Sequence, residues 1–158
     1  MSLNNIKTKL REERGFTIVE LLIVIVVIGI LAAITIVSFN NVTSKANTSN
    51  AASNAEAVQK VAESFNADNN RYPGTLADFT ATANTVKLPS GVTVLISPTA
   101  LASSNGKNSI VYKYKGASAT TATGGSVNYW DFGTNAVSTT VIYVGDGKAG
   151  DTFVQIAS

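Results

Sequence analysis

The feature that most constrains this chain is a run of nineteen residues without a charged side chain, from Leu21 to Phe39. Within the run, only Thr35 and Ser38 have polar side chains. An α-helix rises about 1.5 Å per residue, so the run would be roughly 29 Å long, close to the hydrocarbon thickness of a bilayer. It therefore predicts a helix that can cross a membrane.

The charges on either side of this run predict its orientation. Residues 1–15 contain four basic and two acidic side chains, whereas residues 16–158 contain eight of each. Because positive charge stays on the cytoplasmic side, we expect the N-terminus inside the cell and the C-terminal part outside. The outer part has no net charge, and so it lacks the electrostatic signature of a nucleic-acid-binding domain.

Missing residue types limit the chemistry that the chain can perform. There is no cysteine, hence no disulfide and no thiolate, and no histidine, the commonest general base. The carboxylates outside the helical segment are scattered, without a paired or Ser–Lys arrangement. We therefore expect neither an enzyme nor a bound cofactor.

The apolar run continues into an amphipathic segment. Residues 40–70 contain neither proline nor glycine, and apolar residues recur there at spacings of three and four, which is typical of one helix face. These residues are Ala51, Ala55, Val58, Ala62 and Phe65. The pattern predicts one helix from Phe16 to Asn69, roughly 80 Å long. Its Asn/Ser/Thr-rich part, 40–54, is expected to fray or bend.

The sequence changes character at "RYPGTLADF" (71–79), where Pro73 and Gly74 predict a turn that ends the helix. Short β-like runs follow, separated by Gly, Asn and Pro. They are 92–96, 109–115, 127–132, 139–144 and 152–157. Between them, "GASATTATGG" (116–125) predicts a loop, and Trp130 and Phe132 are expected in the core.

These elements predict an α+β fold. A long N-terminal helix, transmembrane in its first half, packs through its second half on a small antiparallel sheet of about four strands. The predicted divisions are 1–15, a leader; 16–39, the transmembrane segment; 40–70, the amphipathic continuation; and 71–158, a globular sheet domain that we call the head.

One carboxylate, Glu20, stands at the start of the apolar segment. A charge in hydrocarbon is costly unless it is paired, although Glu20 is close enough to the leader to reach the lipid headgroups. If the chain were cut between Gly15 and Phe16, Phe16 would present an ammonium four residues before Glu20. Paired between two helices, these groups would set the axial register, a role for which buried ion pairs are well attested.

The stretch "RGFTIVELLIVIVVIGILAAI" (14–34) resembles the class III leader and N-terminal helix of type IV pilins. The resemblance implies that prepilin peptidase recognises Gly15 and cleaves before Phe16. It also implies that Phe16 becomes N-methylated and that Glu20 pairs with a neighbour's N-terminus during assembly. The pilin fold that it implies, a long helix on a small sheet, agrees with the fold predicted above.

The chain departs from the best-known pilins in two places. It lacks the cysteine pair that closes their C-terminal loop, so the sheet edge must be held otherwise. It also has Val37 where many Gram-negative pilins have a kinking proline. Gly29 remains, and local melting of about 29–38 in a filament is a hypothesis that continuous helical density there would contradict.

The resemblance further implies a surface filament built from many copies of the chain. The implied partners are prepilin peptidase, an assembly ATPase and an inner-membrane platform, with the membrane holding the subunit before assembly. Motility, adhesion and DNA uptake all remain open as tasks. The main rival interpretation is a pseudopilin of a secretion or DNA-uptake filament. A single-pass anchor holding a surface domain, and a secretory signal cleaved near "LAA" (31–33), also remain open.

Two weaker patterns lie in the head. "GDGKAGD" (145–151) places Asp146 and Asp151 as candidate calcium ligands, against the plainer interpretation of hairpin turn residues. Lys107, Lys113 and Lys115, beside Tyr112 and Tyr114, form a candidate nucleic-acid contact. A second interpretation is that these lysines block unwanted pairing of an edge strand.

Overall fold

The structure is a computed structural model and describes residues 15–157, so that most of the predicted leader, 1–14, lies outside the described residues. The chain divides into two compact units, one up to Asn40 and one from Asn41 onward. The fold is α+β, as predicted, with one long N-terminal helix and a small sheet.

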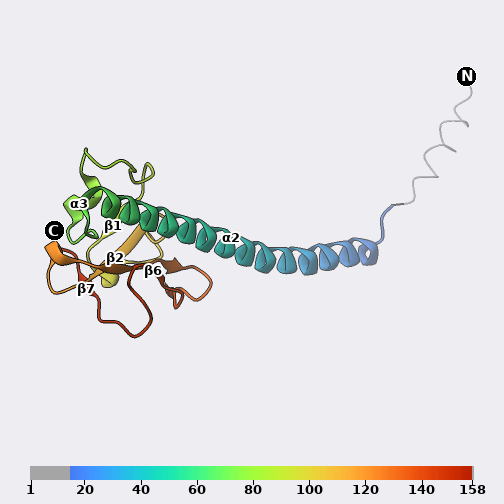
Figure 1. Ribbon diagram of the computed structural model, residues 1–158. Coiled ribbons are helices and arrows are strands. Elements are labelled where there is room, and N and C mark those ends of the chain that lie inside the picture. Colours follow the sequence, from blue (N-terminus) through green and yellow to red (C-terminus); the bar gives the residue numbers. More distant parts are fainter. Residues whose placement is uncertain (1–14, 158) are drawn as a thin grey trace, which may run out of the picture. The chain divides into compact units, whose positions relative to one another are not determined.

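Helix α2 (Ile18–Asn69) contains 52 residues, in agreement with the predicted long helix (Figure 1). It starts after Thr17 rather than at Phe16. Asn70 follows it in a left-handed conformation, with φ of 54°, which ends the helix just before the predicted turn. The segment 40–54 is helical throughout, and so the expectation that it would fray is wrong, whereas the bend stays a prediction.

Contacts within the second unit explain why this polar part of α2 stays helical. The Thr48 hydroxyl donates to Asp131 Oδ1 at 3.1 Å and accepts from the Phe132 N–H at 2.9 Å. Further along, Gln59 donates to the Tyr143 carbonyl, and Glu63 accepts from the Gly145 N–H. The helix therefore makes hydrogen bonds at several positions to loops and strand ends. The helix sequence alone does not predict these partners.

The apolar stripe of α2 forms one side of the core. All five predicted residues, Ala51 to Phe65, are buried, together with Val61. The main sheet covers them in the second unit (Figure 1), and β2 contributes Ile110, Tyr112 and Tyr114 from one face. Tyr112 packs edge-on against Phe79, with ring centroids 4.8 Å apart. This helix-on-sheet packing is the one that the sequence predicts.

The main sheet has five strands in the order β1–β2–β3–β6, with β7 also paired to β2. The strands are β1 (Thr93–Leu95), β2 (Ser109–Lys115), β3 (Gly124–Asn128), β6 (Ile142–Gly145) and β7 (Val154–Gln155). The β2–β3, β3–β6 and β2–β7 pairs are antiparallel, but β1 runs parallel to β2. The prediction of a purely antiparallel sheet is therefore wrong at β1, because 96–108 forms a crossover rather than a hairpin.

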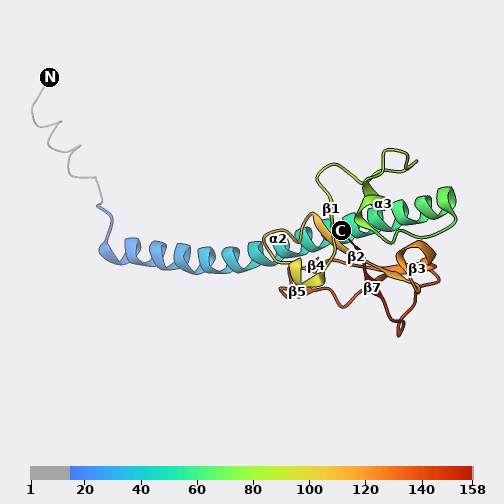
Figure 2. The same cartoon turned by 90° about the vertical axis from the view of Figure 1, so that its left-hand side faces the viewer.

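The predicted strand 127–132 divides into two elements. β3 ends at Asn128, and β4 (Trp130–Asp131) pairs separately with β5 (Ala136–Val137) beside α2 (Figure 2). Trp130 and Phe132 are consequently only half-buried, so the prediction that they lie in the core is wrong. Tyr129 belongs to the core instead. The last two residues of the predicted loop 116–125 belong instead to β3, which begins at Gly124. Gly125 fits there because a Cβ atom would lie 2.5 Å from the Tyr112 hydroxyl.

The turn after α2 contains a short helix, α3 (Leu76–Thr80), that the sequence pattern did not predict. Thr75 and Asp78 form a capping box at its start, because each side chain accepts from the other residue's backbone N–H. Asp78 also accepts from the Gly74 N–H at 2.9 Å and pairs with Arg71 at 2.9 Å. A Cβ atom on Gly74 would lie 2.1 Å from the Ala119 carbonyl oxygen, so glycine is required there.

Two short 3₁₀ helices complete the second unit. η1 (Pro98–Ala100) lies between β1 and β2, and η2 (Ala119–Thr121) lies between β2 and β3. The C-terminal segment is held by β7 and by a single bridge between Thr75 and Ala157.

Candidate functional site

The predicted cleavage bond joins Gly15 to Phe16, immediately before α2. Residues 15–17 are not helical, and Phe16 is 87% exposed. A protease must bind its substrate in an extended form, which an exposed bond outside a helix allows. The structure thus places Gly15 and Phe16 where cleavage would need no unfolding of α2.

Glu20 is bonded within its own first helical turn. Its Oε2 atom accepts from the Thr17 N–H at 2.9 Å and from the Thr17 hydroxyl at 2.7 Å. In return, the Glu20 N–H donates to the Thr17 hydroxyl at 3.2 Å. This is a capping box, which satisfies N–H groups that a helix start otherwise leaves without partners.

We did not predict from the sequence that Glu20 caps α2, although the sequence contains the pattern of a capping box. "TIVE" (17–20) has the T-x-x-E spacing of a capping box directly before an apolar run. Both carboxylate bonds fall on Oε2, and within residues 15–157 no side chain or backbone group bonds to Oε1. The capped carboxylate therefore has an oxygen available for an ammonium from another chain.

The apolar side chains that follow Glu20 are all exposed in the first unit. None of the large ones from Ile18 to Phe39 is less than 48% exposed. α2 is long and apolar enough in this part to cross a membrane, and none of its most apolar window is buried. In water such a surface would be strongly unfavourable, so it requires lipid or other apolar helices around it.

Gly29 lies inside this exposed part of α2, where the helix is continuous. A Cβ atom at Gly29 would meet nothing within 4 Å, so the single chain gives no packing reason for a glycine. Melting near Gly29 in a filament stays a prediction.

The two candidate calcium ligands, Asp146 and Asp151, lie close together, but both pair with the side chain of Lys115. Lys115 Nζ lies 3.1 Å from Asp151 Oδ2 and 3.3 Å from Asp146 Oδ2. Among the described residues, no group of three or more His, Cys, Asp or Glu side chains could hold a metal ion. Calcium prefers six to eight oxygen ligands, so two carboxylates that already share an ammonium do not fit it.

The predicted nucleic-acid contact is not assembled. Tyr112 and Tyr114 point into the core and are at most 8% exposed, so they cannot stack on bases. Lys115 is engaged by the two aspartates. The second interpretation, edge lysines that block strand pairing, is also wrong, because β2 is paired on both sides.

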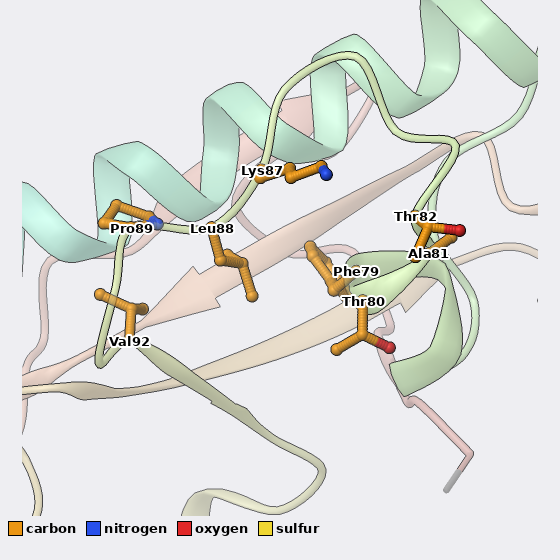
Figure 3. Close-up of a pocket in the computed structure, with 8 residues that line it drawn as sticks. All are labelled: Phe79, Thr80, Ala81, Thr82, Lys87, Leu88, Pro89 and Val92. Carbon is orange, nitrogen blue, oxygen red and sulfur yellow. The ribbon is translucent and has the colours of Figure 1, made fainter.

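A surface pocket in the second unit lies between α3 and the segment before β1 (Figure 3). Phe79 and Leu88 point toward each other across it, and Val92 closes one end. Lys87 is the single charged residue among those that line it. This lining offers neither a nucleophile with a base nor a pair of carboxylates, and so it supports no catalytic role.

One family model matches the N-terminal part of this chain. Residues 10–36 match the prokaryotic N-terminal methylation motif. This match includes Gly15, Phe16 and Glu20 as well as the first part of α2.

Three relatives illustrate the similarity to whole proteins. The type II secretion system core protein G of Aeromonas hydrophila is 35% identical over 74 residues, 47% of this chain and 52% of the relative. The type IV major pilin protein PilA of Myxococcus xanthus is 42% identical over 59 residues, 37% of this chain and 27% of the relative. A fimbrial protein of Pseudomonas aeruginosa is 40% identical over 55 residues, 35% and 36% of the two chains.

The matched part thus spans about half the length of these relatives or less. No solved structure matches this chain at a significant level. Pilins and pseudopilins are structural subunits rather than enzymes, and on this ground the expectation that the chain is not an enzyme is confirmed. The resemblance inferred from the leader and the helix is also confirmed: this chain carries the prokaryotic N-terminal methylation motif and is a relative of type IV pilins and of the type II secretion core protein G.

Proposed function

We propose that this protein is a prepilin that becomes the structural subunit of a type IV pilus. One observation carries the proposal: Glu20 lies four residues after an exposed, non-helical Gly15–Phe16 bond, at the start of a helix whose apolar side chains are all exposed. A plain membrane anchor would need the apolar helix and could use Glu20 as its cap, but it would have no use for an exposed bond four residues before that carboxylate.

Processing creates the group that Glu20 requires. Prepilin peptidase removes residues 1–15, and the new N-terminus at Phe16 carries a positive charge whether or not it is methylated. In an apolar filament core, this ammonium and the Glu20 carboxylate of another subunit are each costly alone and much less costly together. Oε2 of Glu20 continues to cap its own helix through Thr17, while Oε1 receives the neighbour.

Assembly transfers the apolar helix from lipid to other copies of itself. Before assembly, segment 16–39 crosses the membrane with the N-terminus in the cytoplasm and the head outside. The assembly ATPase and the inner-membrane platform then extract each subunit into a helical homopolymer. Helix–helix contacts hold its core, and the ion pair sets the axial register. The heads form the outer surface, where the Ser/Thr-rich loop 116–123 is available to surface ligands or glycans.

A pseudopilin of a type II-like secretion filament is the second candidate function. The similarity to core protein G of Aeromonas hydrophila extends over 74 residues, beyond the 59 that match the Myxococcus xanthus pilin. The N-terminal site is the same in both proposals, so this observation bears only on the task of the filament.

Deletion of the gene distinguishes the two candidates. A pilus subunit predicts the loss of long surface filaments, counted by electron microscopy of negatively stained cells, with unchanged export of proteins to the medium. A pseudopilin predicts the reverse, namely retained surface filaments and a loss of exported proteins. Complementation with the intact gene is the control, and retention of both properties would contradict both proposals.

A further inference from the structure

The Lys115 ammonium contacts three oxygen atoms that all belong to one loop. Lys115 is the last residue of β2, and its Nζ lies 3.1 Å from Asp151 Oδ2 and 3.3 Å from Asp146 Oδ2. The Asp146 carbonyl oxygen is a third partner, at 3.1 Å. Both aspartates belong to the connection between β6 and β7, and so one ammonium joins the middle of the sheet to this connection.

The two carboxylates are held in place by other groups. Asp146 Oδ1 accepts from the Thr123 hydroxyl at 2.9 Å, and Asp151 Oδ2 accepts from the Lys148 N–H at 2.9 Å. The Asp151 side chain is 17% exposed and that of Lys115 26%, whereas Asp146 is 55% exposed. The Lys115–Asp151 pair is therefore the better shielded from solvent, and charge-assisted bonds of this kind are stronger than neutral ones.

Few backbone pairs hold the segment that this cluster anchors, although Ile156 is buried in the core and Phe153 packs against Tyr143. β7 forms only two residue pairs with β2, Lys113 with Gln155 and Tyr114 with Val154. Beyond β7, one bridge joins Ala157 to Thr75. The chain contains no cysteine, so no disulfide can close this loop. A strand of only two residues frays readily unless side chains fix it.

We propose that Lys115 serves as an internal cation that fixes the C-terminal segment 146–157 to the sheet, in place of a metal ion or a disulfide. The ammonium occupies the point at which the two carboxylates converge, so a divalent cation could bind only by displacing it. The head is then fully folded without calcium. This inference rests on the second unit alone and is independent of the proposed filament function.

A pair of matched variants tests the proposal in the full-length protein in detergent. Lys115→Gln removes the ammonium, whereas Lys113→Gln removes the same charge two residues earlier on the same face of β2. We expect amide hydrogen exchange in residues 146–157 to accelerate about tenfold in Lys115→Gln, with β3 unchanged, and to stay within about twofold of the wild-type rate in Lys113→Gln. Equal protection of segment 146–157 in the two variants would overturn the proposal.

Two further variants keep the test decisive if Lys115→Gln does not fold. Asp151→Asn removes the better shielded partner from a surface loop and should accelerate exchange in the same segment. Lys115→Arg keeps the positive charge and should retain most of the protection. Unchanged exchange in Asp151→Asn, or the same acceleration in Lys115→Arg as in the glutamine variant, would contradict an internal cation.

The metal alone provides an independent test on the wild-type protein. Millimolar calcium, compared with a chelator, should change neither the melting temperature of the head nor the exchange of residues 146–157. A melting temperature that rises with calcium concentration would show that the carboxylates take the metal in preference to Lys115, and it would overturn the proposal.

Discussion

A Glu20→Ala variant is expected to be cleaved before Phe16 and to remain in the membrane, yet to form at least about tenfold fewer filaments. The variant leaves the ammonium of a neighbouring Phe16 without a partner in an apolar core. Such an uncompensated buried charge costs about 3–5 kcal/mol, which exceeds a tenfold effect at each subunit contact. The measurement is the amount of the protein in sheared, pelleted filaments relative to the membrane fraction, with cleavage checked by intact mass.

The capping box complicates this experiment, because alanine at position 20 also removes the carboxylate that accepts from the Thr17 N–H and hydroxyl at the start of α2. Glu20→Gln separates the two tasks: glutamine can accept the same bonds from Thr17, but it has no charge. Thr17→Ala is the opposite control, since it removes the hydroxyl that accepts from the Glu20 N–H and keeps the carboxylate. The register role predicts that Glu20→Gln assembles as poorly as Glu20→Ala and that Thr17→Ala assembles much better. Normal filaments from either position-20 variant would refute the role.

The second large effect is expected from Asp78→Ala, which should destabilise the head by about 3 kcal/mol. The Asp78 carboxylate accepts from Gly74 and Thr75 and pairs with Arg71 while only 12% exposed. Alanine would leave the two N–H groups unpaired in the turn between α2 and the sheet. It would also remove the carboxylate partner of Arg71, whose guanidinium keeps bonds to the Tyr72 and Ala119 carbonyls. Thermal unfolding of the full-length protein in detergent measures the loss.

The matched control is Asp68→Ala, which removes an exposed aspartate that accepts a long bond from the Thr85 N–H, at 3.4 Å. Its melting temperature should lie close to that of the wild-type protein. A similar small change for Asp78→Ala would show that the turn does not depend on this carboxylate.

The Asp78 carboxylate also gives a pH dependence with a defined sign. Burial alone would raise the pKa of Asp78, but the bonds from Arg71, Gly74 and Thr75 outweigh it and hold the pKa below the ordinary value of 3.8. A lowered folded-state pKa stabilises the head above the unfolded-state pKa, and the contribution disappears as the pH falls through the folded-state pKa. The stability difference between the wild type and Asp78→Ala should therefore be constant near neutral pH and shrink below pH 3.8.

The elements that the sequence predicted well depend on local patterns. The apolar run and the stripe from Ala51 to Phe65 predict α2 because helix periodicity is a property of neighbouring residues. Strand 109–115 was also predicted with its observed bounds. The Thr17–Glu20 capping box is equally local, because its T-x-x-E spacing stands directly before the apolar run.

The features that could not be predicted depend on segments far apart in the chain. The sequence of 92–96 does not predict that β1 pairs in parallel with β2. The direction of this strand pairing depends on the path of the crossover between the two strands. The division of 127–132 likewise follows from the bonds of Thr48 to Asp131 and Phe132. Asp146 and Asp151 were correctly grouped, but their shared partner, Lys115, becomes evident only once β2 lies beside the β6–β7 connection.

The central claim is that the chain is cut before Phe16 and assembled through its helix. The most direct measurement is the N-terminal residue and intact mass of the protein in filaments sheared from the cell surface. We predict a chain that begins at N-methylated Phe16. A chain that begins at Met1 or beyond Ala33, retained in the membrane or free in the medium, would contradict the claim and would leave Glu20 with its capping role alone.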